Sequence, residues 1–471
     1  MNVLINHIHK NRCRWREKKT RFFLTCALVF LSAGMSHTSH ATEAKAIEVS
    51  ENHRHLQRAD GTPFFYLGDT AWCLFHRLTR EEADLYLQDR ADKGFSVIQA
   101  VALSELDGLT EPNAYGELPL IDRNPATPNE KYFEHVDYVV RRANELGMTI
   151  GLLPSWGRYW RDGNALIFTP ESALTYAQFL GERFRDADII WILGGDSNVR
   201  SYSERSIMDA LAKGLKRGDN GKHLITFHPR GPGRASEQLR DAEWLDFYMN
   251  QSSHAAANLD TGLYVEYDRK LDPSRPTIDG EPRYEGIPVG FYNHGHNPIV
   301  RFEDDDIRQA AWWSTLAGAA GFTYGNNNIW QMWTPERKPA IGANVSWKQA
   351  LNDPGAQQVG YLRRFMEEHE FQTLVAAQDL ILDGPTTGAG KIRAARSTDG
   401  KRIIVYSPQG DQVTLDLKSL TGPYHNQTWF NPRYGTSFTF RKEQSFGIQT
   451  FTPPSSGQGK DWVLVLETTS D

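Results

Sequence analysis

The feature that most constrains the fold is an alternation of short apolar runs with amphipathic stretches between residues 64 and 370. Such runs are typical of strands buried on both faces of a parallel sheet, and the stretches between them are typical of helices that cover it. Eight βα units in succession predict a (β/α)8 barrel. The expected strands are Phe64–Gly68, Ser96–Leu103, Thr149–Pro154, Ile189–Gly194, Leu224–His228, Trp244–Met249, Pro276–Asp279 and Gly321–Tyr324.

Helix signals lie between the expected strands. Thr79, followed three residues later by Glu82, is typical of a capping box, and Gly147 marks a helix end. An open doubly wound sheet is the alternative fold, but the segment after the first strand, from Leu67 to Trp72, lacks the glycine-rich phosphate turn. The barrel is therefore the preferred fold. Helices are expected over 79–93, 129–146, 170–184, 202–217, 304–319 and 354–369.

The pattern changes after about residue 379. Short strand-like runs separated by turn residues predict a small all-β sandwich. We therefore expect a catalytic barrel over residues 42–375 and a β-sandwich domain over 376–471, packed closely because no low-complexity linker separates them. The expected strands are Ile392–Ala395, Arg402–Ser407, Gln412–Leu417, Asn426–Phe430, Thr436–Phe440 and Trp462–Glu467.

The first 41 residues have the pattern of a secretory signal peptide. Basic residues from Lys10 to Arg21 precede an apolar run, Phe22–Gly34, and a small-residue site follows at Ser39-His40-Ala41. The apolar run is too short to span a bilayer, so no membrane segment is expected. The sequence therefore predicts an exported protein, periplasmic or extracellular.

Charge and cysteine content exclude several classes of protein. Seven of the 52 basic and one of the 58 acidic residues lie in the leader, which leaves 45 against 57 and a formal charge of −12. Binding to nucleic acid, which requires clustered Lys and Arg, is not expected. Only Cys73 remains after the leader, so no intrachain disulfide is possible and a large core must stabilise the fold. No obligate protein partner is evident.

Two acids stand out among the residues that follow the expected strands, where barrel enzymes place their catalytic groups. Asp196 follows Gly194-Gly195, whose lack of side chains lets the backbone approach a ligand, and Glu281 follows the seventh strand. Glycoside hydrolysis needs two such carboxyl groups, one as acid and one as nucleophile or base. Acids at strand ends also cap helices or hold loops, and Glu285 is the nearest rival to Glu281.

Other polar and aromatic strand-end residues are candidates for substrate binding. Exposed aromatic faces suit the apolar faces of sugar rings, and amides, histidines and arginines suit hydroxyl or uronate groups; packing and loop support are the competing interpretation for each. These candidates are Asp69, Trp72, Trp156, Trp160, Asn198, His228, Arg230, Gln251, Arg283 and Asn326.

Other catalytic chemistry finds little support in the sequence. The two His-x-His pairs, at His53 and His294, lie away from the end of the first strand, and no His-Glu-x-x-His motif occurs. A Gly-x-Ser-x-Gly nucleophile turn is also missing. We therefore expect no metal and no cofactor.

Four motifs make the chain similar to a known family. LGDTAW (67–72), WILGGDSN (191–198), DGEPRYEG (279–286) and YGNNNIW (324–330) resemble the apiosidase-like catalytic domain of glycoside hydrolase family 140. The segment with WFNPRYG (429–435) resembles a small β domain described as a collagen-binding domain of a collagenase. This label does not imply collagen binding, because fold resemblance does not transfer function.

The resemblance implies a barrel hydrolase that releases apiose from pectic side chains, with Asp196 as general acid/base and Glu281 as nucleophile. The resulting hypothesis is a retaining double displacement on an oligosaccharide or polysaccharide. Two alternatives remain: an arabinofuranosidase or galactofuranosidase on the same barrel, and a non-catalytic carbohydrate- or matrix-binding protein.

Overall fold

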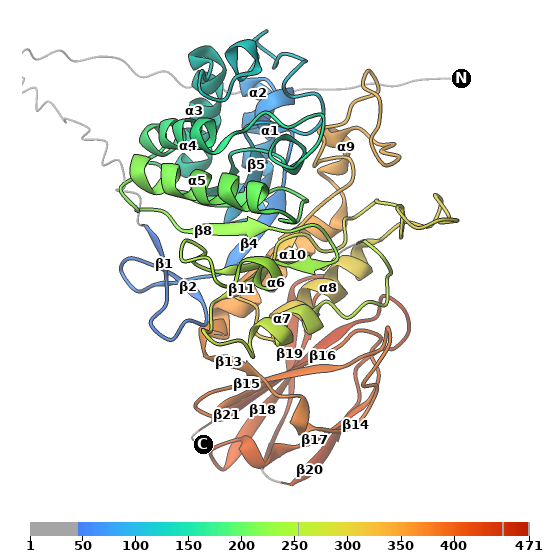
Figure 1. The fold of residues 1–471 in the computed structure, drawn as a ribbon. Coiled ribbons are helices and arrows are strands. Elements are labelled where there is room, and N and C mark those ends of the chain that lie inside the picture. Colours follow the sequence, from blue (N-terminus) through green and yellow to red (C-terminus); the bar gives the residue numbers. More distant parts are fainter. Residues whose placement is uncertain (1–45, 253, 445–446, 470–471) are drawn as a thin grey trace, which may run out of the picture. The chain divides into compact units, whose positions relative to one another are not determined.

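The computed structural model describes residues 46–252, 254–444 and 447–469. The proposed leader lies outside these residues. A parallel sheet forms the centre of the catalytic region (Figure 1). Its eight parallel strands, all buried, are β4 (Tyr66–Thr70), β5 (Val97–Val101), β6 (Thr149–Leu153), β7 (Ile189–Gly194), β8 (Ile225–His228), β10 (Tyr248–Gln251), β11 (Thr277–Asp279) and β12 (Gly321–Tyr324).

The sheet curls into a barrel, as the sequence predicts. Strands pair in the order β8-β7-β6-β5-β4-β12-β11-β10. Hydrogen bonds join its two ends. The Asp246 N–H donates to the Ile225 carbonyl (2.9 Å), the Ile225 N–H donates to the Asp246 carboxylate (2.7 Å), and the Thr226 hydroxyl donates to the Phe247 carbonyl (2.8 Å). The sequence does not predict β9 (Gly233–Arg234), a short antiparallel strand beside β10.

Helices cover the outside of the barrel. The predicted capping box at Thr79 and Glu82 is formed, and Gly147 ends its helix with φ 80°. The six expected helices are α2 (Arg80–Asp92), α3 (Glu130–Glu145), α4 (Pro170–Arg183), α5 (Tyr202–Gly218), α8 (Asp304–Leu316) and α10 (Pro354–Glu368). Four shorter ones were not expected: α1 (Leu74–Arg77), α6 (Ala235–Leu239), α7 (Gly262–Asp268) and α9 (Trp347–Ala350).

A three-stranded antiparallel sheet lies at the amino-terminal end of the barrel strands. It consists of β1 (Ile47–Val49), β2 (Leu56–Arg58) and β3 (Pro63–Phe64). Arg58 pairs with Asp188, directly before β7 (2.7 Å). The sheet therefore contacts the end of the barrel opposite to the βα loops.

The carboxy-terminal region is the predicted β-sandwich (Figure 1). Its larger antiparallel sheet has the order β13-β15-β16-β21-β18-β19, and its smaller sheet has the order β14-β17-β20. The strands are β13 (Leu374–Ala376), β14 (Ile381–Asp383), β15 (Arg393–Ser397), β16 (Arg402–Ser407), β17 (Val413–Asp416), β18 (Tyr424–Asn431), β19 (Thr436–Gln444), β20 (Ile448–Phe451) and β21 (Trp462–Thr469).

The sandwich packs on α8 and α10 along a buried seam. Arg308 of α8 forms a bidentate pair with Asp461 (2.9 and 3.0 Å), and both side chains are 2% exposed. Next to this pair, Trp312 stacks on Tyr406 with ring centroids 5.6 Å apart. The seam thus contains both a buried ion pair and apolar packing. Among the described residues, no helix has the length and apolarity of a membrane span.

Candidate active site

A cavity of about 330 Å³ opens at the carboxyl ends of the barrel strands. This is the end at which barrel enzymes bind their substrates. Three carboxyl groups and several aromatic rings face it. Its lining includes Trp72, Glu105, Leu106, Trp156, Asp196, Arg230, Gly231, Gln251, His254, Glu281, Tyr284, Ile287, Phe291, Tyr292, Trp330, Ala340 and Ile341.

Asp196 lies on a strained turn after β7. Gly194, Gly195 and Asp196 all have positive φ, of 93°, 87° and 50°. A side chain at Gly194 would place Cβ 2.4 Å from the His228 carbonyl oxygen, and one at Gly195 would place it 2.9 Å from the Trp156 ring. Only glycine fits at these two positions, and a left-handed Asp196 is the kind of strain found at functional sites.

Glu281 follows β11, and two imidazoles hold its carboxylate. His254 Nε2 lies 3.2 Å from Oε1, and His228 Nε2 lies 3.0 Å from Oε2 in a less well-aligned geometry. The backbone N–H of Asp196 donates to His228 Nδ1 (3.2 Å). His228 Nδ1 therefore acts as an acceptor, which leaves Nε2 as the nitrogen that can donate to Glu281.

These contacts give the two acids opposite pKa shifts. Burial acts to raise the pKa of Glu281, but hydrogen bonds and charge from His228 and His254 outweigh it and lower the pKa to about 2. Burial and the negative charge of Glu281 raise the pKa of Asp196 to about 6, against smaller effects of His228 and Arg230. Below pH 6 Glu281 is therefore ionised and Asp196 is protonated, the combination that glycoside hydrolysis requires.

Glu105 supplies a third carboxyl group to the cavity. Burial and the charges of Asp196 and Glu281 raise its pKa to about 8, although Arg158 and a hydrogen bond with Trp156 act in the opposite direction. Glu105 is therefore neutral at pH 7 and can donate a hydrogen bond. Glu105 follows the second barrel strand, but it is not among the site residues predicted from the sequence.

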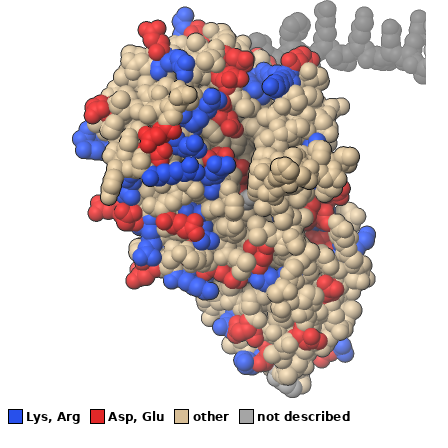
Figure 2. All heavy atoms as spheres, turned by 45° about the vertical axis from the view of Figure 1, so that its right-hand side comes forward, with Lys and Arg blue, Asp and Glu red and all other residues tan. Residues whose placement is uncertain are grey.

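The two sides of the cavity mouth differ in chemistry. The loops after β6 and β8 each supply an exposed arginine, whereas the loops after β11 and β12 supply aromatic and aliphatic side chains. Figure 2 shows a hollow with Lys and Arg side chains gathered along one side and mostly uncharged surface on the other. Arg230 lines the cavity, Arg158 donates to the carbonyl of the cavity residue Glu105 (2.9 Å), and the apolar wall includes Phe291, Tyr292, Trp330 and Ile341.

Six of the predicted binding residues lie at or next to the cavity. Trp72, Trp156, Arg230 and Gln251 line it. His228 lies behind Glu281 and makes ring contacts with both tryptophans, with centroids 5.4 and 6.3 Å away. Asn198 supports the rim, because its side-chain oxygen accepts a hydrogen bond from the Arg230 N–H (2.9 Å).

Asp69 does not reach the cavity. It is fully buried, and its Oδ2 accepts hydrogen bonds from Arg90 Nε (2.5 Å) and the Tyr86 hydroxyl (2.6 Å), both on α2. A substrate-binding role is therefore wrong for Asp69, and its structural role is to join β4 to α2. Glu285 is also structural, since it accepts from the Tyr324 hydroxyl (2.6 Å) and the Gly355 N–H (3.1 Å).

Three more predicted binding residues point into the protein. Trp160 is buried and donates to the Gly194 carbonyl (2.7 Å), which supports the Asp196 turn. Arg283 is buried, and Nη1 donates to the Asp306 carbonyl (3.0 Å). Asn326 is buried and donates to Asp353 (2.7 Å). Each of these three residues follows a barrel strand, as predicted. Its side chain, however, points towards a helix or a loop and not into the cavity.

Several cavity residues were not predicted as site residues. His254 is not among the candidates predicted from the sequence, and the signal that could have found it is its place three residues after the end of β10. Tyr284 and Phe291 face His254, with ring centroids 4.6 and 5.8 Å away. Among the described residues, no group of three or more His, Cys, Asp and Glu is arranged to hold a metal ion.

The barrel and its paired carboxyl groups define the class of a glycoside hydrolase, and solved structures support this. A structure named glycoside hydrolase is 32% identical, covers 91% of this chain and 98% of its own, and has a TM-score of 0.83. A glycoside hydrolase family 5 protein from Bacteroides vulgatus is 31% identical, covers 90% of this chain and 94% of its own, and has a TM-score of 0.83. A second protein from that organism, at 14% identity and a TM-score of 0.65, shares the fold.

The chain belongs to the family of the apiosidase-like catalytic domain, whose model matches residues 50–373. A second model, "Putative collagen-binding domain of a collagenase", matches residues 375–467. No curated protein matches the chain.

Proposed function

We propose that the protein releases an apiosyl group, a branched pentofuranosyl unit, from the side chains of pectic polysaccharides. The observation that carries this proposal is that Asp196 and Glu281, the latter held by two imidazoles, line one cavity of an apiosidase-like domain. The cavity, at about 330 Å³, is near the small end of ligand pockets, which favours release of one terminal sugar.

The proposed mechanism is a double displacement. Ionised Glu281 attacks the anomeric carbon while Asp196 donates its proton to the glycosidic oxygen, so that the leaving group departs as an alcohol. The ester at Glu281 carries no charge, and the charge of Glu281 is the main electrostatic cause of the raised pKa of Asp196. The pKa of Asp196 therefore falls in the intermediate, and Asp196 becomes the base that activates water.

The arginines at the mouth supply a place for an acidic leaving group. Arg158 and Arg230 are exposed beside the cavity, whereas the carboxyl groups lie inside it. A neutral sugar in the cavity with uronate groups outside it fits this arrangement of charge. We also propose export to the periplasm or the extracellular space, on the basis of the leader sequence.

The direct test is incubation with pectic oligosaccharides that carry terminal apiosyl, arabinofuranosyl or galactofuranosyl groups. Identification of apiose as the released sugar, with retained anomeric configuration by NMR at early times, supports the proposal. Release of arabinose or galactose makes the protein another furanosidase. Binding without turnover of any member of this panel would contradict a catalytic role.

A further inference from the structure

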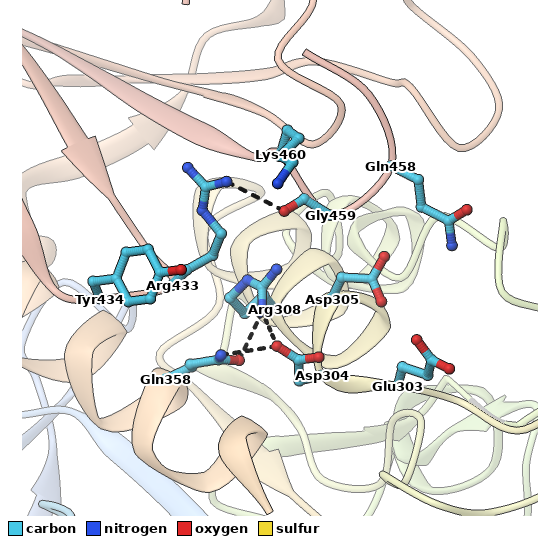
Figure 3. Close-up of a pocket in the computed structure, with 10 residues that line it drawn as sticks. All are labelled: Glu303, Asp304, Asp305, Arg308, Gln358, Arg433, Tyr434, Gln458, Gly459 and Lys460. Atoms are coloured by element: carbon cyan, nitrogen blue, oxygen red, sulfur yellow. Dashed lines mark hydrogen bonds and ion pairs between the residues drawn. The ribbon is translucent and has the colours of Figure 1, made fainter. Parts of the chain in front are cut away.

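Two more cavities lie side by side along the seam between barrel and sandwich. The larger, of about 500 Å³, lies between the start of α8 and the sandwich residues Arg433, Tyr434 and Lys460 (Figure 3). The smaller, of about 200 Å³, has Asn258 and Gln409 in its lining. Asp305, Gln458 and Gly459 line both cavities, so the two form one continuous groove, the seam groove.

The seam groove lies at the same end of the barrel as the catalytic cavity. α8 begins where the loop from the carboxyl end of β11 ends. Asn258 lies four residues after His254, a residue of the catalytic cavity, in the loop that follows β10. Arg283, two residues after Glu281, donates to the Asp306 carbonyl in the first turn of α8 (3.0 Å). The loops after β10 and β11 therefore contribute residues both to the catalytic cavity and to the groove.

The buried seam fixes the walls of the groove. Arg308 pairs with Asp461 on the sandwich and with Asp304 on its own helix, and it also donates to Gln358 of α10 (2.7 Å). Figure 3 shows the contacts of Arg308 with Asp304 and Gln358, with Arg433, Gln458 and Lys460 across from the acidic start of α8. Because these walls are already fixed, little free energy is lost to ordering of protein side chains when a ligand binds in the groove.

The lining chemistry suits the hydroxyl groups and ring faces of sugars. Asn258, Gln409 and Gln458 make no side-chain hydrogen bond to another residue that the structure describes, and amides can both donate to and accept from hydroxyl pairs. Tyr434 is 69% exposed and offers an aromatic face.

The two walls of the seam groove carry side chains of opposite charge. Acidic side chains at the start of α8 face Arg433 and Lys460 of the sandwich, and Arg308 is already paired with Asp461. A polyuronate would meet repulsion along one wall, so an uncharged glycan fits better.

We propose that the seam groove binds a neutral, hydroxyl-bearing stretch of the same polysaccharide whose terminal sugar enters the catalytic cavity. This inference rests on the proposed function and assigns a role to the sandwich, which forms one wall of the site. Binding at the groove raises the effective concentration of the cleavable end at the catalytic cavity. The gain appears only with substrates long enough to reach both places.

The first test compares Tyr434→Ala and Gln458→Ala in the full-length enzyme. The KM for a branched polysaccharide should rise about fivefold, the loss expected for one aromatic contact, with kcat unchanged. The KM for a short oligosaccharide with the same linkage should not change. Tyr424→Ala is the matched control, because Tyr424 is also an exposed sandwich tyrosine but lies at the other end of β18. An unchanged KM for the polymer, or equal losses on both substrates, would overturn the proposal.

The second test separates binding from turnover. Glu281→Gln, with and without Tyr434→Ala, is examined by affinity electrophoresis in arabinan, galactan and polygalacturonate. Retardation by a neutral polymer that the second substitution weakens supports the proposal, even if the unaltered enzyme cleaves no apiosyl linkage and the proposed function fails. No retardation by either neutral polymer, or stronger retardation by polygalacturonate that depends on Tyr434, would overturn the proposal.

Discussion

The Asp196 loop and the Glu281 segment meet in one cavity but are built in opposite ways. Asp196 lies on a turn of three residues with positive φ, and its carboxyl group has only modest stabilisation of its charge. Glu281 follows a short buried strand, and imidazoles hold both of its oxygens. The comparison shows that the surroundings, and not the residue type, assign the role of each acid.

Glu281→Gln should cause the largest loss, because the amide cannot form the ester intermediate. We expect kcat to fall on the order of 10⁴-fold or more, measured as initial rates of sugar release. Glu285→Gln is the matched control, since Glu285 lies four residues away and its carboxyl group accepts from Tyr324 and Gly355 and does not line the cavity. Equal losses in both variants would contradict the assignment of Glu281 as the nucleophile.

Asp196→Asn should lower kcat/KM by about 10²–10⁴-fold, the usual contribution of a general acid. The unaltered enzyme is active with Glu281 ionised and Asp196 protonated, so its activity should decline as the pH rises through about 6. The variant should lack this alkaline decline, because asparagine does not titrate. A decline of the same shape in the variant would assign it to another group.

His254→Gln should affect the Glu281 side alone. Loss of this partner weakens the stabilisation of the carboxylate, so the pKa of Glu281 should rise from about 2 and the acid limb of the pH profile should move to higher pH. A lost hydrogen bond to a charged group corresponds to about a 10-fold lower kcat/KM. His296→Gln, at an exposed histidine, serves as control. An unmoved acid limb would contradict the role of His254.

Gly195→Ala should give the smallest effect, on the Asp196 side. The added Cβ meets the Trp156 ring in a backbone conformation with φ 87°. We expect a loss of about 1–3 kcal/mol in the free energy of unfolding, more than positive φ alone would cause, together with a few-fold fall in kcat. Gly221→Ala has φ 69° and open space around its Cβ, so it should lose stability but keep its kcat. Denaturant unfolding and initial rates measure the two quantities.

Much of the fold could be predicted from the sequence, because parallel strands buried on both faces leave clear apolar runs. The range predicted for β7 is the one observed. The sheet of β1, β2 and β3 has no such signal, since its strands have only two or three residues. Its position depends on distant partners such as Asp188.

The site could be predicted only in part. Asp196 and Glu281 could be placed at one mouth because parallel strands end together. The sequence could not show that Asp69 turns towards Arg90, or that Arg283 turns towards α8, since these partners lie elsewhere in the chain. The roles of His254 and Glu105 depend on neighbours brought together only by barrel closure.

The buried pair of Arg308 and Asp461 also limits the evolution of this protein by exchange of domains. A barrel joined to a foreign sandwich that lacks this acid would leave the buried guanidinium of Arg308 with Asp304 alone, at a cost of up to about 3–5 kcal/mol. The two domains are therefore not interchangeable modules. Recombination between relatives should succeed only when the α8 residue and its acidic partner are inherited together.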